Sequence, residues 1–384
     1  MANNNENKVL NVPHLRFPEF SGEWKEEQLD SIATLSKGIG ISKEQLSEDG
    51  EPCILYGELY TKYKSEIIKH VESKTDIDSS KLKRSKANDV IIPCSGETAV
   101  DIATARCVPF DNILLGGDLN VISLHKYDGA FMSYQLNGKR KYDIARVAQG
   151  VSVVHLYGEH LKAIKTYNPS LPEQQKIAEL LSLIDERIAT QNKIIEDLKK
   201  LKSAISERLL KGVKGSTVLL SDICDIVKGK QINGENLSES GNYYVMNGGT
   251  ELSGYYDDYN VEANTISISE GGNSCGYVQF NTSPFWSGGH CYSIQDITDN
   301  VDNLYLYHYL KSKEDAIMKL RIGSGLPNIQ KKDLAMFKKK NPAVEQQLKI
   351  STFLSSLERK AEIEERIQNA LLKEKQYLLH QMFI

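Results

Sequence analysis

Residues 168–210 read NPSLPEQQKIAELLSLIDERIATQNKIIEDLKKLKSAISERLL, and residues 341–383 read NPAVEQQLKISTFLSSLERKAEIEERIQNALLKEKQYLLHQMF. The two stretches align without a gap at a shift of 173 residues, so that Gln174 coincides with Gln347 and Leu181 with Leu354. In each stretch, hydrophobic residues recur at alternating intervals of four and three, which places them in one stripe along an α-helix. We therefore predict two long amphipathic helices that are copies of each other.

The hydrophobic stripe of each predicted helix is typical of a coiled-coil seam, because its repeat of 3.5 residues is sustained. The nearest partner of each helix is the other copy, so we expect the two helices to pair. The alternative is two ordinary amphipathic helices that pack on separate domain cores. The predicted seam residues are Ile177, Leu181, Ile184, Ile188, Ile195, Leu198, Ile205, Leu209, Ile350, Leu354, Leu357, Leu371, Leu378 and Met382.

The ends of the first predicted helix follow from local sequence signals. Pro172 suits the first turn, where no intrahelical N–H is lost, and Glu173 suits the positive end of the helix dipole. A cation followed by glycine, Lys211-Gly212, is typical of a helix C-terminus. We therefore expect a helix that begins after Pro169 and ends near Lys211.

The segments that precede the two helices are also related to each other. Lys37-Gly38 aligns with Lys228-Gly229 at a shift of 191, and Gly116-Gly117 aligns with Gly288-Gly289 at a shift of 172. Between these matches, short β-type runs are separated by glycine and proline turns, as strands are. Examples of such runs in the first half are 90–92, 119–124 and 151–154, and residues 127–136 are a candidate helix.

This organisation predicts an internal tandem duplication of a domain followed by a helix. We expect an α+β fold in which two strand-rich domains are joined and separated by two long helices, which form an antiparallel coiled coil with pseudo-twofold symmetry. The predicted segments are 1–166 for the first domain with an N-terminal arm, 167–214 for the first helix, 215–340 for the second domain and 341–384 for the second helix.

The bulk composition points to a cytoplasmic globular protein. No run of 18 apolar residues exists, so nothing is expected to span a membrane, and residues 1–8 are too polar for a signal peptide. The six cysteines form no C-x-x-C pair, which favours reduced structural thiols over disulfides or a zinc site. The net charge of −4 does not exclude nucleic acid, because local basic clusters suffice for a DNA-binding face.

Three blocks of sequence resemble the specificity subunits of Type I restriction-modification systems. Residues 13–24, PHLRFPEFSGEW, resemble the N-terminus of that family, and 168–177 and 341–350 resemble the openings of its conserved helices. The domain order is similar over essentially the whole chain. The second copy departs from the pattern, because Gln346 stands where the first copy has Glu173, and Ala361 and Glu364 weaken its predicted seam.

The resemblance implies two target recognition domains, each of which reads one half of a bipartite, asymmetric site in double-stranded DNA. It implies that the helices space the domains and recruit two methyltransferase (modification) subunits, with two restriction-translocation subunits in the full complex. It also implies a chain without catalytic activity of its own. S-adenosylmethionine, ATP and Mg²⁺ are then expected on the partner subunits.

The chain lacks the sequence motifs of two common classes of enzyme, in agreement with the expected absence of catalysis. The chain has no phosphate-binding Gly-x-x-x-x-Gly-Lys-Ser/Thr loop and no Asn/Asp-Pro-Pro-Tyr/Phe methyltransferase motif. We expect no catalytic residue and no metal ligand. Three alternatives remain at this point, namely a specificity module of another methyltransferase or nuclease system, a coiled-coil scaffold that binds proteins only, and a self-sufficient nuclease.

Residues that contact DNA are predicted from side-chain chemistry, because lysine and arginine bind phosphates or guanine and asparagine binds adenine. Lys37 and Lys228 are expected to contact phosphates at equivalent positions. For Tyr56, Tyr243 and Tyr255, packing is favoured over base stacking. The candidates are Lys37, Tyr56, Lys62, Lys64, Arg84, Lys86, Ser95, Thr98, Lys139, Arg140 and Lys141 in the first domain, and Lys228, Lys230, Asn247, Asn273, Ser274, Arg321, Asn328, Lys331 and Lys332 in the second.

Overall fold

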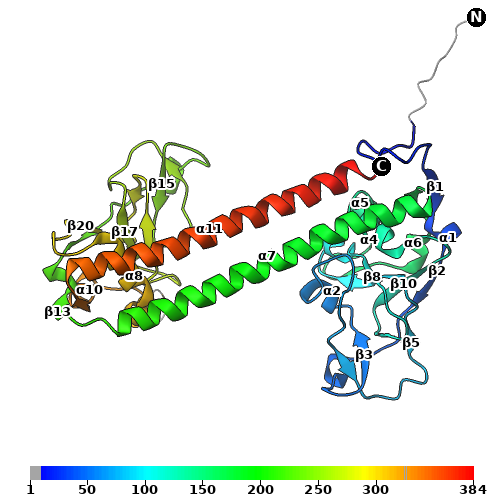
Figure 1. Cartoon of the computed structure of the whole chain (residues 1–384), viewed down its shortest axis with the longest axis horizontal. Helices are drawn as coiled ribbons and strands as arrows, with labels where there is room; N and C mark the ends of the chain where they lie inside the picture. Colours follow the sequence, from blue (N-terminus) through cyan, green and yellow to red (C-terminus); the bar gives the residue numbers. More distant parts are fainter. Residues whose placement is uncertain (1–9, 324, 326) are drawn as a thin grey trace, which may run out of the picture. The chain divides into compact units, whose positions relative to one another are not determined.

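The computed structural model describes residues 10–323, 325 and 327–384, so most of the predicted N-terminal arm lies outside the described residues. The chain forms two compact units, of which unit 1 comprises Met1–Asn192 with Ile367–Ile384 and unit 2 comprises Lys193–Arg366. Each unit therefore contains one strand-rich domain and a segment of both long helices, α7 and α11 (Figure 1). The units divide the chain differently from the four predicted segments, because both helices contribute to both units.

The two long helices are present where the repeat predicts them. Helix α7 spans Leu171–Lys211 and α11 spans Val344–Gln381. Pro172 and Glu173 lie in the first turn of α7, and the helix ends at Lys211, as expected. At about 1.5 Å per residue, α7 is roughly 60 Å long.

Contacts between α7 and α11 show that the helices run antiparallel in each unit. In unit 1, Gln368 donates a hydrogen bond to Asn192, and Lys375 lies 2.6 Å from Asp185, so later residues of α11 meet earlier residues of α7. In unit 2, Lys199 lies 2.7 Å from Glu365, and Lys202 pairs with Glu358. The predicted pairing of the two helices is confirmed.

The hydrophobic stripe of both helices is covered. Every seam residue named from the sequence is buried or half-buried, and none is exposed. In unit 1, Ile177 and Leu181 join a cluster with Trp24, Phe131 and Phe383. In unit 2, the stripe continues in a cluster formed by Leu210, Val213, Tyr305, Tyr309, Ile350 and Leu354.

Each strand-rich domain has its own central four-stranded sheet, whose strands are all antiparallel, and the strand order is the same in both. In the first domain its strand order is β2 (Ala33–Lys37), β10 (Leu119–Leu124), β6 (Asp89–Pro93) and β8 (Arg106–Val108). In the second it is β14 (Asp225–Lys228), β20 (Cys291–Gln295), β17 (Thr265–Ser269) and β18 (Val278–Asn281). The sheet order thus repeats element by element, as a duplication requires.

Shorter strands repeat in the same way. A two-stranded sheet begins each repeat, with β1 (Lys25–Gln28) on β12 (Lys165–Asn168) and β13 (Ser216–Leu219) on β21 (Lys338–Asn341). A parallel pair follows in each domain, with β3 (Glu51–Ile54) on β9 (Leu114–Leu115) and β15 (Tyr243–Met246) on β19 (Trp286–Ser287). The remaining strands are β4 (Lys74–Thr75), β5 (Lys83–Arg84), β7 (Ser95–Gly96), β11 (Val154–His155) and β16 (Tyr255–Tyr256).

Short helices cover the sheets. The α-helices are α1 (Leu29–Ile32), α2 (Glu58–Thr61), α3 (Ala99–Ile102), α4 (Gly129–Asn137), α5 (Lys141–Val147), α6 (Gly158–Lys162), α8 (Asn303–Ser312), α9 (Glu314–Met318) and α10 (Lys331–Ala335). The 3₁₀ helices are η1 (Lys43–Gln45), η2 (Leu220–Asp222) and η3 (Gly234–Asn236). The helix predicted at 127–136 corresponds to α4, and the strand predicted at 119–124 to β10.

One expected strand is mostly absent. Of the valine-rich run at 151–154, only Val154 belongs to a strand, β11, whereas Val151 lies on an exposed loop. The physical reason is the turn imposed by Gly150, whose φ of +125° is unfavourable for other residues and reverses the chain before a strand can form.

Gln174 and Gln347 explain why the helix openings repeat so closely. The side-chain carbonyl of Gln174 accepts a hydrogen bond of 2.9 Å from the Asp128 backbone N–H at the start of α4, and its amide donates to the Pro169 carbonyl. Gln347 makes the same two contacts, with the backbone of Asp302 at α8 and of Pro342. Each long helix is thereby fixed to the domain that precedes it.

No helix within the described ranges has both the length and the apolar composition that crossing a bilayer requires.

Candidate nucleic-acid interface

Lys37 and Lys228 end equivalent strands of the two central sheets. Lys37 is the last residue of β2 and lies opposite Asn120 of β10, and Lys228 is the last residue of β14 and lies opposite Tyr292 of β20. The glycine that follows each lysine passes close to the neighbouring turn. A Cβ at Gly38 would lie 1.9 Å from the Gly116 carbonyl oxygen, and a Cβ at Gly229 would lie 2.2 Å from that of Gly288. These glycines let the two loops approach closely, which fixes where each lysine leaves the sheet.

In the second domain, a carboxylate positions the lysine. The Lys228 amine lies 2.7 Å from Glu270 Oε1, and the Tyr292 hydroxyl lies 3.1 Å from the same oxygen. His290 Nδ1 lies 4.0 Å from Glu270 Oε2. Glu270 is nearly buried, whereas Lys228 and His290 are exposed. The nearly buried Glu270 thus contacts both an exposed lysine and an exposed histidine, and it orients them at the surface.

In the first domain, the backbone around Lys37 has the same hydrogen bonds as that around Lys228, but the neighbouring side chains differ. Cys94 follows β6 as Glu270 follows β17, and each backbone N–H donates to the equivalent turn, Cys94 to Asp118 and Glu270 to His290. The Lys37 amine lies 5.7 Å from the centre of the Tyr157 ring, a cation–π contact. The acidic group here is Asp118, which stands at the position of His290. Equivalent backbones therefore present different donors and acceptors.

A recess of about 740 Å³ opens in the first domain next to these residues. Its lining includes Tyr56, Lys64, Ser95 and Val153. Arg106 forms part of its wall, and its guanidinium donates to the Tyr63 carbonyl oxygen at 3.0 Å. Burial lowers the pKa of Arg106, but a guanidinium stays charged at neutral pH. The recess combines two cations, Lys64 and Arg106, with hydroxyls and aromatic rings, which suit contact with nucleic acid, and with the carboxylates of Glu97 and Asp101.

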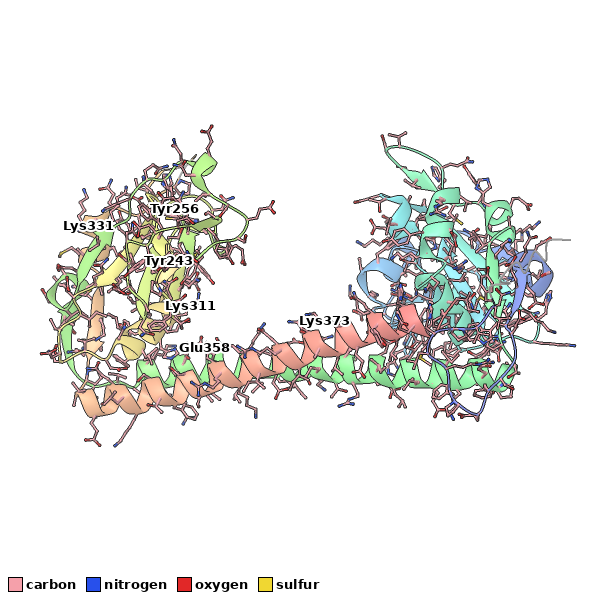
Figure 2. The ribbon with its side chains drawn as sticks, turned by 90° about the horizontal axis from the view of Figure 1, so that it is seen from above. Tyr243, Tyr256, Lys311, Lys331, Glu358 and Lys373 are labelled. Carbon is pink, nitrogen blue, oxygen red and sulfur yellow. The ribbon has the colours of Figure 1, made fainter. Side chains whose placement is uncertain are left out.

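Loops of the second domain bring several predicted residues to the surroundings of Glu270. The Asn247 side-chain oxygen accepts a hydrogen bond of 3.1 Å from the His290 backbone N–H. Asn328 forms a β-bridge with Gly271, and Asn273 and Ser274 follow on the same loop. Lys331 and Lys332 begin α10, and Lys331 is exposed (Figure 2).

Aromatic side chains form pairs on the strand-rich part of unit 2. The rings of Tyr243 and Tyr259 have centroids 4.8 Å apart, and those of Tyr256 and Trp286 have centroids 5.1 Å apart. The Trp286 indole N–H donates to the carbonyl of Lys230. Tyr243 and Tyr256 thus lie against other rings, whereas Tyr56 in the first domain is exposed.

Several predicted DNA contacts are engaged within the chain. Lys62 pairs with Glu58 at 2.7 Å, and Arg84 binds both oxygens of Glu51, which lowers the pKa of that carboxyl to about 2. Arg140 donates to the backbone oxygen of Ile384 and lies 3.2 Å from Asp143, between the half-buried Lys139 and Lys141. Thr98 caps α3. None of these side chains lines the recess, and their role in DNA binding stays a prediction, as does that of the exposed Lys86 and Arg321.

Four residues at this interface are not predicted from the sequence, namely Asp118, Tyr157, Glu270 and His290. A signal for two of them exists, because Asp118 and His290 directly follow the aligned pairs Gly116-Gly117 and Gly288-Gly289. A comparison of residue types at these two positions does not single them out, because Asp118 in the first domain is aligned with His290 in the second. The position of Glu270 beside Lys228 follows only from the pairing of the strands in the structure.

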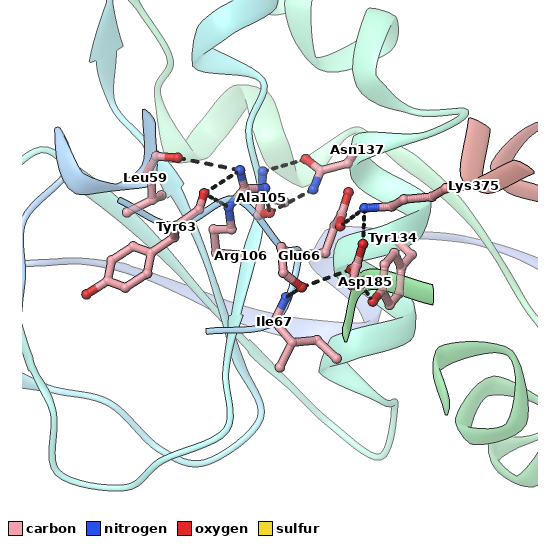
Figure 3. Close-up of polar contacts among 11 residues, drawn as sticks. Leu59, Tyr63, Glu66, Ile67, Ala105, Arg106, Tyr134, Asn137, Asp185 and Lys375 are labelled. Atoms are coloured by element: carbon pink, nitrogen blue, oxygen red, sulfur yellow. Dashed lines mark hydrogen bonds and ion pairs between the residues drawn. The ribbon is translucent and has the colours of Figure 1, made fainter. Parts of the chain in front are cut away.

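A buried group of charges ties the recess of unit 1 to both helices (Figure 3). The Lys375 amine of α11 lies 2.5 Å from Glu66 and 2.6 Å from Asp185 of α7. The hydroxyls of Tyr134 and Ser65 donate to the other Asp185 oxygen at 2.8 and 2.9 Å. We call this group, Ser65, Glu66, Tyr134, Asp185 and Lys375, the clamp. Because Glu66 and Ser65 follow α2 and Tyr63, the clamp holds the segment that shapes the recess.

Unit 2 contains a matching group at a shift of 173 residues. Tyr307, Glu358 and Lys202 correspond to Tyr134, Asp185 and Lys375, with the lysine now on α7 and the carboxylate on α11. Lys202 pairs with Glu358, and the Tyr307 hydroxyl donates to Glu358 at 3.1 Å. Each long helix therefore supplies the acid of one group and the lysine of the other.

Within the described residues, no group of three or more His, Cys, Asp or Glu side chains is arranged to hold a metal ion. All six cysteines are buried and free, and burial raises the pKa of Cys94 and Cys291 to about 11. The thiols are thus packing groups rather than nucleophiles at neutral pH.

Comparison with protein families identifies the same repeat. The model described as the Type I restriction modification DNA specificity domain matches twice, over residues 21–200 and 213–373. Each match covers one strand-rich domain together with most of the helix that follows it. Together the two matches cover most of the chain.

Individual relatives carry the same description. A protein of Mycoplasma pneumoniae named as a type I specificity subunit is 34% identical over 116 residues, which are 30% of this chain and 31% of that protein. A Methanocaldococcus jannaschii protein named as a type I restriction enzyme specificity subunit is 25% identical over 253 residues, 57% of this chain and 58% of that protein. The matches therefore span between about a third and somewhat over half of these curated relatives.

Among solved structures, the fold is shared over nearly the whole chain. The crystal structure of a Type I restriction-modification S subunit from M. genitalium superposes with a TM-score of 0.71 and covers 97% of this chain and 99% of that one. Only 20% of the residues are identical, so this likeness concerns the fold.

Proposed function

Because this chain belongs to the family of Type I restriction-modification specificity subunits, we propose that its two strand-rich domains each read one half of a bipartite, asymmetric DNA sequence. The observation that supports this most directly is the shared framework with unshared chemistry. Lys37 and Lys228 leave equivalent strands, but Glu270 binds Lys228 whereas Cys94 occupies the corresponding position beside Lys37. Two domains with one backbone plan and different polar groups suit two different short sequences.

The test is to co-express the chain with methyltransferase subunits and to map the methylated adenines in genomic DNA. We expect a motif with two specified halves and an unspecified spacer. The double variant Glu270→Gln/His290→Ala should then change the bases required in one half and leave the other half intact. Methylation without sequence preference, or a motif that changes in both halves, would contradict the proposal.

Lys37 and Lys228 are proposed to contact phosphates. Lys37→Ala or Lys228→Ala should weaken binding to every duplex and reduce the slope of log affinity against log salt by about one. Lys25→Ala, on strand β1, is the matched control. Binding should be measured at several salt concentrations with the chain in its methyltransferase complex, and a loss confined to one sequence would count against phosphate contact.

The two long helices are proposed to fix the spacer between the half-sites. Helix α7 contributes to both units without interruption, which supports this role. Inserting seven residues in each helix, after Gln191 and before Gln368, preserves the heptad pattern and lengthens the helices by about 10 Å. The mapped spacer should grow by about three base pairs at 3.4 Å each, and an unchanged spacer would refute the role.

We also propose that two methyltransferase subunits bind exposed faces of the helices, with two restriction-translocation subunits in the full complex. Apolar side chains outside the seam support this. In unit 1, Leu183 and Ile367 are exposed beside a groove of about 780 Å³ between α7 and α11, and in unit 2 Phe353 is exposed beside another. Exposed apolar patches of this kind mark interaction surfaces. The chain would then be non-catalytic, with S-adenosylmethionine, ATP and Mg²⁺ bound by its partners.

Co-purification tests this docking. The double variant Leu183→Ser/Ile367→Ser should lose the methyltransferase subunits, whereas Leu252→Ser, an exposed leucine of the second domain, should retain them. Charge reversal at Glu186, Arg187, Glu196 and Lys200 tests the polar part of α7, where Glu186 pairs with Lys69 and Glu196 with Lys200. An intact complex after all of these changes would exclude these faces.

A further inference from the structure

A short hairpin, residues 149–155, projects from the first domain beside the recess, and we call it the finger. The Gln149 N–H donates to the His155 carbonyl oxygen at 2.9 Å, and the His155 N–H donates back at 2.7 Å. Between them, Gly150 adopts a φ of +125°, and a Cβ there would lie 2.1 Å from the Val153 carbonyl oxygen. The loop is therefore closed at its base and tightly turned near its tip.

The base of the finger is anchored in the sheet. Strand β11 pairs with β7, which places His155 opposite Ser95. The next residue, Leu156, is fully buried, donates to the Cys94 carbonyl oxygen at 2.8 Å and accepts from the Asn120 side chain at 3.0 Å. The finger thus leaves the domain at the end of the central strands, next to Lys37 and Ser95.

The tip of the finger is apolar and exposed. Val151 is 97% exposed and Val153 is 52% exposed. Val153 also lines the recess, together with Tyr56 and Ser95. Valine is among the side chains that proteins most often bury, and apolar side chains grouped on a surface mark a contact site. Two exposed valines on a loop whose base is closed by two hydrogen bonds are therefore a candidate contact surface.

The surroundings of the tip favour duplex DNA as that molecule. The Lys37 amine lies near the Tyr157 ring, two residues beyond the end of the finger, and Lys64 lines the same recess as Val153. Arg106, Glu97 and Asp101 line this recess as well, so both signs of charge are present. Lys37 and Lys64 beside an apolar tip fit a ligand with phosphates outside and an apolar group inside. In the major groove, that apolar group is the 5-methyl of thymine.

We infer that Val151 and Val153 contact thymine methyl groups in the half-site that the first domain reads. This inference rests on the proposed function, and it assigns a base and a chemical contact to one element of the domain. The backbone of the second domain supports the assignment of this role to the finger. There, Ile322 and Asn328 form the equivalent bridge at a shift of 173, and Gly323 has a φ of +102°. The bridge and the positive-φ glycine at the base of the finger thus recur in the second domain.

The experiment uses the full chain in complex with its methyltransferase subunits and duplexes that carry the mapped motif. Each thymine of the motif is replaced in turn by deoxyuridine, which lacks only the methyl group. Wild-type affinity should fall about four-fold at one or more thymines, the effect expected for one methyl contact of about 0.8 kcal/mol. The double variant Val151→Ala/Val153→Ala should bind the two duplexes equally at the thymines of a single half-site.

Val12→Ala is the matched control, because Val12 is an exposed valine that precedes β1 and should leave thymine discrimination unchanged. Urea unfolding of the double variant should match wild type, since both valines lack buried surroundings. The inference is overturned if no thymine of the motif is sensitive to deoxyuridine, or if the double variant discriminates as wild type does. Wild-type binding that does not prefer the motif over unrelated duplex would instead overturn the proposed function, and the inference with it.

Discussion

Replacing Lys375 by methionine would remove the cation of the clamp and leave two carboxylates buried in unit 1. The Lys375 amine lies 2.5 Å from Glu66 Oε2 and 2.6 Å from Asp185 Oδ1, and the three side chains are only 13%, 9% and 7% exposed. Methionine retains much of the aliphatic volume of lysine, so the change acts on charge more than on packing. The perturbation therefore isolates the electrostatic role of the clamp.

The magnitude follows from the burial of the charges that remain. Leaving an uncompensated buried charge typically destabilises a protein by about 3–5 kcal/mol. Tyr134 and Ser65 still donate to Asp185 after the substitution, so we expect a loss of about 3 kcal/mol in the free energy of unfolding of unit 1. The neutral triple variant Lys375→Met/Glu66→Gln/Asp185→Asn should recover most of it, because replacing a whole buried ion group by uncharged residues is often nearly neutral.

The assay can follow unit 1 alone. The chain has two tryptophans, Trp24 in unit 1 and Trp286 in unit 2. Trp24 is buried, and its indole N–H donates to Glu173 at 3.3 Å, so its emission reports the core that holds α7. In a Trp286→Phe background, urea unfolding followed by tryptophan fluorescence gives the stability of unit 1.

Two results would refute the reasoning. One is a Lys375→Met variant whose unit 1 unfolds at the same urea concentration as its parent. The other is a triple variant no more stable than the single one, since the loss would then come from packing and not from unpaired charge. Lys202→Met is the matched control, because Lys202 belongs to the equivalent group in unit 2 and should leave the Trp24 transition unchanged.

Three further predictions concern stability. Burial lowers the pKa of His308 from 6.5 to about 4, so the folded state favours the neutral ring, and its contribution is present above pH 6.5 and lost as the pH falls toward 4. Between pH 7 and 5 the wild type should therefore lose about 2 kcal/mol that His308→Gln does not lose; parallel pH profiles from urea unfolding would contradict this. Gly38→Ala should destabilise unit 1 by about 2 kcal/mol or more, because its Cβ meets the Gly116 carbonyl, and unchanged unfolding would exclude the close approach. Gln174→Ala leaves the Asp128 N–H and the Pro169 carbonyl without their partner and should cost about 2 kcal/mol, measured in the same way.

The repeat made the architecture predictable from the sequence. A shift of 173 residues predicted two equivalent helices, and their heptad spacing predicted a paired, covered stripe. The start of α7 after Pro169 and its end at Lys211 followed from ordinary helix-end signals. These features depend on residues close together in the chain, which is why pattern alone could reveal them.

Contacts between distant residues were not predictable in this way. The clamp joins Glu66, Asp185 and Lys375, and nothing local indicates that these three charges meet. The ion pair of Arg84 with Glu51 likewise joins residues that no local pattern links. Valine content suggested a strand where Gly150 instead forms a turn. For the clamp and for Arg84, partners distant in the sequence decide what a side chain contacts, whereas at Gly150 a local backbone turn overrides the strand preference of valine.

Unit 1 is completed only by residues at the C-terminal end of the chain, which affects how the protein folds during synthesis. Residues 367–384 belong to unit 1, although they leave the ribosome after every residue of unit 2. Until they arrive, Trp24, Phe131 and Ile177 lack their neighbours Met382 and Phe383. Unit 2 can therefore fold before unit 1 is complete. Unit 1, although its first part is translated earliest, keeps hydrophobic surface exposed for longer. Nascent chains in such a state are prone to aggregate.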